Sequence, residues 1–87
     1  MNIEQFEVFK VITQEESFTK AAKLLNMTQP AISAQIKQLE KKYSVKLFDR
    51  SNSGVKLTDA GVIFYDYGEK MLSIFKEMEA ELIKKSC

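Results

Sequence analysis

The side chains in this sequence best suited to binding chemistry are basic, and they gather in its middle. Residues 17–58 carry a net charge of +6, and their basic members are Lys20, Lys23, Lys37, Lys41, Lys42, Lys46, Arg50 and Lys56. Residues 1–16 balance to −3 and residues 59–87 to −2, so the total of +1 hides this segregation. Ammonium and guanidinium groups on one stretch favour binding of anions such as phosphate. Solvated lysines on exposed helix faces would give the same count, so charge alone leaves both interpretations open.

Most enzymatic chemistry lacks its usual residues here. The sequence has no His, the commonest general base and metal ligand, and its single Cys is Cys87. No Gly-rich phosphate loop follows a predicted strand. Charges recur too often for a signal peptide or a membrane span. We therefore expect no cofactor and no metal, place the protein in the cytoplasm, and disfavour an enzyme.

The elements that must position the basic residues are predicted to be helices. Hydrophobic residues make up 45% of the chain, while Gly (three) and Pro (one) are scarce, which predicts a mainly α protein of one small domain. An apolar stripe of Ile3, Phe6, Phe9 and Ile12 predicts a first helix from about Ile3 to about Gln14 that belongs to the core.

Two more helices joined by a short turn follow. Ser17 is a good N-cap for a second helix over Phe18–Leu25. Asn26 tolerates the left-handed conformation that ends a helix, and Thr28 can cap a third helix over Gln29–Tyr43. The sequence thus predicts two helices separated by about three residues.

The third helix has one apolar and one polar face. Its apolar residues repeat at helical spacing and are expected to be buried: Ile32, Ile36, Leu39 and Tyr43. The opposite face is small and polar near its start and basic towards its end: Pro30, Ser33, Ala34, Lys37 and Lys41. A short turn followed by a helix with an exposed polar N-terminal half is the helix-turn-helix layout.

After Ser44 the apolar pattern changes its period. Val45, Leu47 and Phe48 precede a polar loop that contains Gly54, and alternation resumes at residues 55–58. Such a pattern predicts a small β-hairpin, which is a wing when it follows a recognition helix. We predict a winged helix-turn-helix domain over residues 1–58.

A long helix capped by Thr58 is predicted for residues 59–87. It carries an apolar seam over about three heptads, and nothing polar converges on that seam. The first half of this helix can lie on the first helix, but the second half needs another partner. A second copy of the chain is the expected partner, through Phe64, Met71, Ile74, Phe75, Met78 and Leu82.

The same segments resemble a known family. The runs at residues 17–25, 28–33 and 35–40, together with Leu47-Phe48-Asp49-Arg50 and residues 57–61, look like the N-terminal domain of LysR-type transcriptional regulators. The resemblance spans nearly all 87 residues, and its motifs stand in the family's order and at the family's spacing. It implies a recognition helix in the major groove of DNA and a linker helix that pairs antiparallel with a second subunit.

Members of that family usually continue into an α/β domain that senses a small-molecule effector. This sequence has no such domain, so we expect it to be part of a longer regulator. It also departs from the family at two places. Position 34 is Ala where Arg is frequent, and Asn52 and Ser53 stand where basic or aromatic residues are frequent. The Ala removes one candidate phosphate or guanine contact, and because of both departures the resemblance does not imply a preferred DNA sequence.

Each candidate DNA contact has a plainer alternative. Gln29, Pro30, Ser33 and Ala34 are predicted to contact bases, although Gln29 could be only a polar first-turn residue and Pro30 only a helix initiator. The residues predicted to contact phosphates or a groove are Ser17, Thr28, Lys37, Lys41, Arg50 and Lys56. Lys41 could be simply solvated, and Arg50 could instead pair with Asp49 or Glu40.

The function hypothesis is a homodimer that reads a roughly palindromic operator in double-stranded DNA. The main rival is a winged-helix module that presents its basic face to an acidic protein. The polar start of the third helix disfavours that rival, because a protein hot spot would prefer exposed aromatic residues there.

Overall fold

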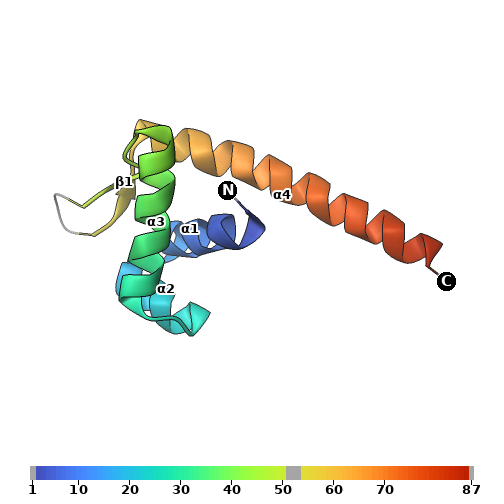
Figure 1. Cartoon of the computed structure of the whole chain (residues 1–87), viewed down its shortest axis with the longest axis horizontal. Helices are drawn as coiled ribbons and strands as arrows, with labels where there is room; N and C mark the ends of the chain where they lie inside the picture. Colours follow the sequence, from blue (N-terminus) through green and yellow to red (C-terminus); the bar gives the residue numbers. More distant parts are fainter. Residues whose placement is uncertain (1, 51–53, 87) are drawn as a thin grey trace.

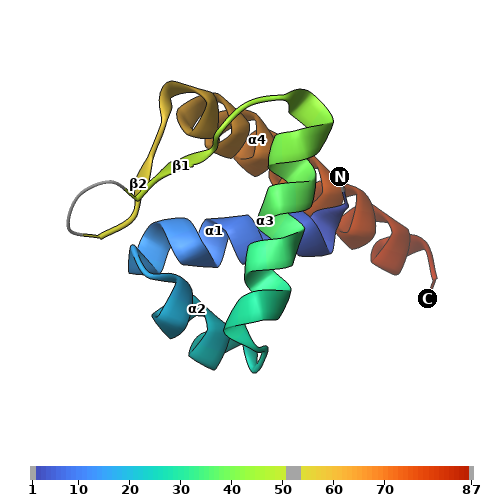
Figure 2. The same cartoon turned by 60° about the vertical axis from the view of Figure 1, so that its left-hand side comes forward.

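The computed structural model describes residues 2–50 and 54–86. Its elements are α1 (Ile3–Glu15), α2 (Phe18–Leu25), α3 (Gln29–Tyr43), β1 (Phe48–Asp49), β2 (Lys56–Leu57) and α4 (Asp59–Lys85). The three short helices and the hairpin form one body, from which the second half of α4 projects (Figures 1 and 2), so that the longest dimension is 51 Å. The predicted winged helix-turn-helix with a long terminal helix is confirmed, and α1 ends one residue beyond the predicted limit.

The predicted helix caps are formed. The hydroxyl of Ser17 accepts a hydrogen bond from the Lys20 amide at 3.0 Å, and that of Thr28 accepts from Ala31 at 3.2 Å. These bonds satisfy amides that have no partner within the helix. Asn26 ends α2 in the left-handed conformation, with φ of 54°. Local chemistry therefore sets both ends of the turn between α2 and α3.

The core lies where α1, α2 and α3 meet, and it is aromatic towards the wing. Phe9 is fully buried and its ring lies 5.1 Å from that of Phe48 and 4.8 Å from that of Phe64. The other wholly or nearly buried large side chains are Phe6, Ile12, Ile32, Ile36, Leu39 and Leu47. Burying this apolar surface is the main force that holds the three helices together.

The exposure of Tyr43 differs from the sequence-based prediction. The residue was predicted to be buried with Ile32, Ile36 and Leu39, yet it is 49% exposed. The last turn of α3 continues the apolar face of the helix past the end of the core. The ring of Tyr43 therefore borders an open pocket instead of a packed neighbour.

The wing is a short antiparallel hairpin. Phe48 pairs with Leu57 and Asp49 pairs with Lys56. Phe48 points into the core and Asp49 points outward, which is the alternation expected for a strand with one buried face. The predicted hairpin is confirmed in these strands, while Asn52 and Ser53 lie outside the described residues.

Two glycines and one ion pair allow α4 to pack closely against the rest of the domain. A Cβ at Gly61 would overlap the carbonyl oxygen of Leu47, and a Cβ at Gly68 would overlap the Phe6 ring. Close approach of α4 thus depends on the missing side chains. Lys10 of α1 and Glu69 of α4 form an ion pair with 2.8 Å between Nζ and Oε1. The first half of α4 is anchored on α1, as predicted.

Residues 2–50 and 54–86 contain neither a candidate membrane span nor a candidate metal site. No helix there is both long enough and apolar enough to cross a membrane. Nor does that part of the chain hold a group of His, Cys, Asp or Glu side chains that could bind a metal ion.

Candidate nucleic-acid interface

The start of α3 presents a small, polar surface. Gln29, Pro30 and Ala34 are exposed and Ser33 is half-buried. On the opposite side of the helix, Ile32 and Ile36 are 0% and 1% exposed. Because the buried side fixes the rotation of α3, Pro30, Ser33 and Ala34 lie on its outer face, while Gln29 is exposed in its first turn. A protruding helix with short polar side chains fits the width of a DNA major groove.

Two capping hydroxyls flank this face. Those of Ser17 and Thr28 each accept a backbone amide at the start of a helix, which leaves the hydroxyl hydrogen free to donate. The positive ends of the helix dipoles of α2 and α3 lie at the same places. Both residues therefore have a free donor and a favourable dipole for a phosphate oxygen.

A shallow depression of about 340 Å³ joins the start of α2, the start of α3 and the wing. Ser17, Gln29 and Arg50 lie along it, so the fold brings together three predicted contacts that are far apart in sequence. Thr19 also lines it. Nothing in the sequence singled out Thr19, because its place beside Gln29 and the wing depends on the packing of α2.

Arg50 makes a contact that the sequence did not suggest. Its guanidinium carbon lies 3.6 Å from the centre of the Phe18 ring. Glu40, one of the partners considered for Arg50, is engaged elsewhere: it accepts the Leu47 amide at 2.8 Å and lies 3.9 Å from Lys46. A cation over an aromatic face is attracted by the ring quadrupole.

The basic residues of α3 continue this surface. Lys37 and Lys41 are exposed and line a groove of about 380 Å³ together with Lys46, whose side chain is 81% exposed. Lys46 was counted in the basic middle of the chain but not singled out as a site residue. Lys56, on β2, is exposed at the outer edge of the wing.

A second surface, which we call the α4 stripe, is apolar and uncovered. It consists of exposed side chains spaced by four or three residues on one face of the helix: Ile63, Tyr67, Met71, Ile74, Met78 and Leu82. Ile63 and Tyr67 were missed, because the heptad pattern had placed Phe64 and Gly68 in the seam.

Phe64 and Gly68 instead face α1 of the same chain. The ring of Phe64 lies 6.0 Å from that of Phe6, and Gly68 is covered by the same ring. Phe75, the remaining predicted seam residue, is 37% exposed and borders the stripe. Packing against α1 therefore rotates the free face of α4 away from part of the predicted seam.

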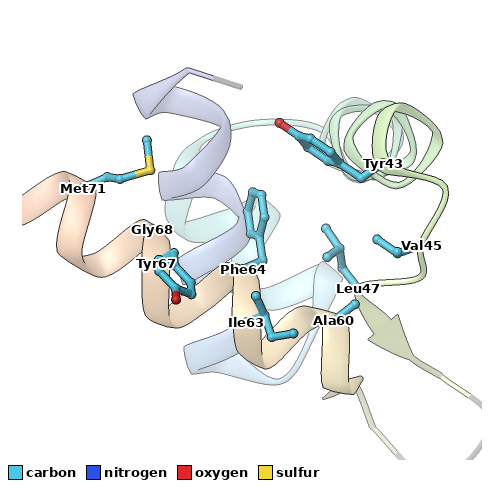
Figure 3. Close-up of a pocket in the computed structure, with 9 residues that line it drawn as sticks. All are labelled: Tyr43, Val45, Leu47, Ala60, Ile63, Phe64, Tyr67, Gly68 and Met71. Carbon is cyan, nitrogen blue, oxygen red and sulfur yellow. The ribbon is translucent and has the colours of Figure 1, made fainter.

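An apolar pocket of about 490 Å³ opens at the start of the stripe (Figure 3). Tyr43 lines it from the last turn of α3 and Val45 from the segment after that helix, while Ile63, Tyr67 and Met71 line it from α4. Exposed apolar surface of this extent on a small protein is typical of an interface.

Several known proteins are similar to this chain. Residues 3–62 match the family model described as "Bacterial regulatory helix-turn-helix protein, lysR family". A probable RuBisCO transcriptional regulator of Cyanophora paradoxa is 47% identical over 76 residues, which are 87% of this chain and 24% of that protein. A protein of the same description from Thalassiosira pseudonana is 41% identical over 75 residues, 86% of this chain and 24% of that protein. The chain therefore spans about a quarter of the length of these curated relatives.

Solved structures agree in fold. The BenM DNA-binding domain in complex with catB site 1 DNA has a TM-score of 0.92 and 35% identity, over 99% of this chain and 97% of that one. The CbnR DNA-binding domain in its DNA complex has a TM-score of 0.91 and 28% identity, with complete coverage of both chains. Because the family model matches well over half of the sequence and the whole fold agrees with it, this chain belongs to the LysR family of bacterial regulatory helix-turn-helix proteins.

Proposed function

We propose that this chain binds double-stranded DNA sequence-specifically, as the DNA-binding part of a transcription regulator. The observation that carries the proposal is the exposed, small and polar start of α3 on a protein whose fold matches DNA-binding domains solved in complex with DNA. A protein-binding surface would need exposed aromatic or large apolar anchors at this place. The residues there are instead Gln29, Pro30, Ser33 and Ala34.

These four residues are the proposed base contacts. The carboxamide of Gln29 can both donate to and accept from an adenine edge. Pro30 and Ala34 can pack against thymine methyl groups, and Ser33 can reach a base or a phosphate. Their common place in the first turns of one rigid helix supports this assignment, since specificity requires the contacting side chains to keep one geometry.

Six further residues are proposed to contact phosphates or a groove wall. Two of them are hydroxyl donors at helix starts and four are exposed cations: Ser17, Thr28, Lys37, Lys41, Arg50 and Lys56. Each cation would release counterions on binding, so affinity should fall steeply as salt increases. These contacts fix the register of the protein on the duplex without reading its sequence.

A homodimer is the proposed assembly, with residues 1–58 as the reading domain and residues 59–87 as the pairing helix. The α4 stripe and the pocket at its start supply apolar surface that this single chain leaves uncovered. The predicted interface residues Met71, Ile74, Met78 and Leu82 all lie on that stripe. Pairing would hold two copies of α3 at a set distance and select a roughly palindromic operator.

The complete regulator is proposed to act in the cytoplasm and to contain a separate effector-binding domain for a small molecule. The curated relatives, about four times as long as this chain, leave room for such a domain.

Selection of duplexes from a randomised DNA pool at near-physiological salt tests the function. We expect enrichment of a two-fold-symmetric site. Retention without enrichment would contradict sequence-specific reading, and no retention at all would favour the protein-binding alternative.

A further inference from the structure

Arg50 leaves the end of β1 and turns back onto the start of α2. Its guanidinium carbon lies 3.6 Å from the centre of the Phe18 ring, the distance of direct stacking contact. The residue itself is exposed and borders the depression that Ser17 and Gln29 also line. The stack therefore places a permanent positive charge beside the start of α3.

The Phe18 ring is a rigid support. Phe18 is the first residue of α2, directly after the N-cap residue Ser17, and it is only 4% exposed. Its ring makes an edge contact with Phe48, with 5.5 Å between centroids and 75° between planes. Phe48 in turn packs on Phe9 in the core. The platform is thus continuous with the hydrophobic core.

A supported arginine binds differently from a free one. A long side chain in solvent loses rotamer freedom when a phosphate immobilises it, and that loss weakens binding. A guanidinium stacked on a ring has already lost part of this freedom, while the N–H donors at its edge remain able to form hydrogen bonds. The support therefore strengthens binding without itself touching the ligand.

We propose that Phe18 is a positioning residue, which holds the Arg50 guanidinium in place for a backbone phosphate of DNA next to the start of α3. The proposal rests on the proposed DNA-binding function. It makes Phe18 more than a core residue, because one face of its ring serves the interface.

A double-mutant cycle tests it. The probe is a labelled duplex taken from the selection experiment, and its dissociation constant is measured over a range of KCl concentrations. Arg50→Ala should weaken binding and lower the magnitude of the salt slope by about 1. Phe18→Leu should weaken binding roughly fivefold when Arg50 is present, and should add no loss when Arg50 is already Ala. Equal losses in both backgrounds would mean a general effect on the core and would overturn the proposal.

Two matched variants sharpen the result. Ile12→Val trims a fully buried side chain of the same core that is not part of the aromatic contacts from Phe9 through Phe48 to Phe18, and at a temperature where it stays folded it should bind the duplex like the wild type. Arg50→Lys keeps the charge but loses the planar group, so it should weaken binding about as much as Phe18→Leu. This variant leaves the core intact and decides the matter even if Phe18→Leu fails to fold.

Three further results of these measurements would each lead to a different conclusion. Wild-type affinity in Arg50→Lys would overturn the positioning role, because a flexible charge would suffice. A loss in Asp49→Asn equal to that in Phe18→Leu would assign the placement of Arg50 to its neighbour and not to the ring. If the wild-type chain binds no duplex, the DNA-binding function itself falls, and with it the phosphate that Arg50 is proposed to meet.

Discussion

Gly68 of α4 lies directly against the ring of Phe6 in α1, so closely that a Cβ at position 68 would occupy the same space as the ring. Phe6 is 1% exposed and has no room to move aside. The absence of one side chain therefore lets the long helix rest on α1. The angle at which α4 leaves that helix depends on this contact.

We expect Gly68→Ala to destabilise the fold. Alanine favours a helix over glycine by about 1 kcal/mol, but overpacking against a buried ring costs more. The net loss in free energy of unfolding should be about 2 kcal/mol, measured by urea denaturation. Ser73→Ala, at an exposed position of the same helix, is the control and should be neutral or slightly stabilising. An increase in stability for Gly68→Ala would show that α4 does not pack this closely on α1.

Gln29 should determine one base position of the operator. Gln29→Ala should weaken binding to the best site by about 1–3 kcal/mol and relax preference at one base pair in each half-site. Lys37→Ala is the matched control, because loss of a phosphate contact weakens binding to all sequences alike. Repeating the duplex selection with each variant measures both effects. A uniform loss across sequences for Gln29→Ala would contradict base reading.

Leu82 should belong to the dimer interface. Leu82→Glu would bury a charge in the α4 stripe, which is strongly unfavourable, and should yield monomers that bind a full operator weakly. Ser73→Glu introduces the same charge elsewhere on α4, outside the stripe, and should remain dimeric. Analytical ultracentrifugation at micromolar concentration distinguishes the two. A dimeric Leu82→Glu protein would place the interface outside the stripe.

The ion pair between α1 and α4 should make stability depend on pH in the alkaline range. The hydrogen bond from Lys10 to Glu69 is the main cause that raises the pKa of Lys10 above its ordinary value of 10.5. Because the pKa is higher in the folded state, the stabilisation is complete below pH 10.5 and is lost as the pH rises through the folded-state pKa.

Glu69→Gln isolates this effect. At pH 8 the variant should be less stable than the wild type by about 0.5 kcal/mol, as for partly exposed pairs, and the difference should shrink above pH 10.5. Glu81→Gln removes an ion pair with Lys84 whose side chains are more than 70% exposed, and it should have no measurable effect. Urea denaturation at several pH values gives the comparison, and a difference that grows with pH would contradict the assignment.

Much of the fold was predictable because it depends on local chemistry. The start of α2 at Ser17 and of α3 at Thr28 follows from side chains that cap their own helix within three residues. The end of α2 at Asn26 follows from the tolerance of Asn for positive φ. The polar face of α3 follows from the 3.6-residue period alone. For these features, the relevant neighbours are all close in sequence.

The tertiary structure decided what depends on contacts between distant segments. Heptad spacing placed Phe64 in a dimer seam, but packing on Phe6 and Phe9 turns it inward and brings Ile63 and Tyr67 to the surface instead. Periodicity shows that a face is apolar, and cannot show which segment will cover it.

The same division holds at the candidate site. The sequence by itself determined that the middle of the chain is basic and that the polar face of α3 carries Pro30, Ser33 and Ala34. Only the fold brought Arg50 onto Phe18, 32 positions earlier, and set both beside Gln29. The physical reason is that a side chain's charge and size are local properties. Its partners depend on how helices and wing close around a common core.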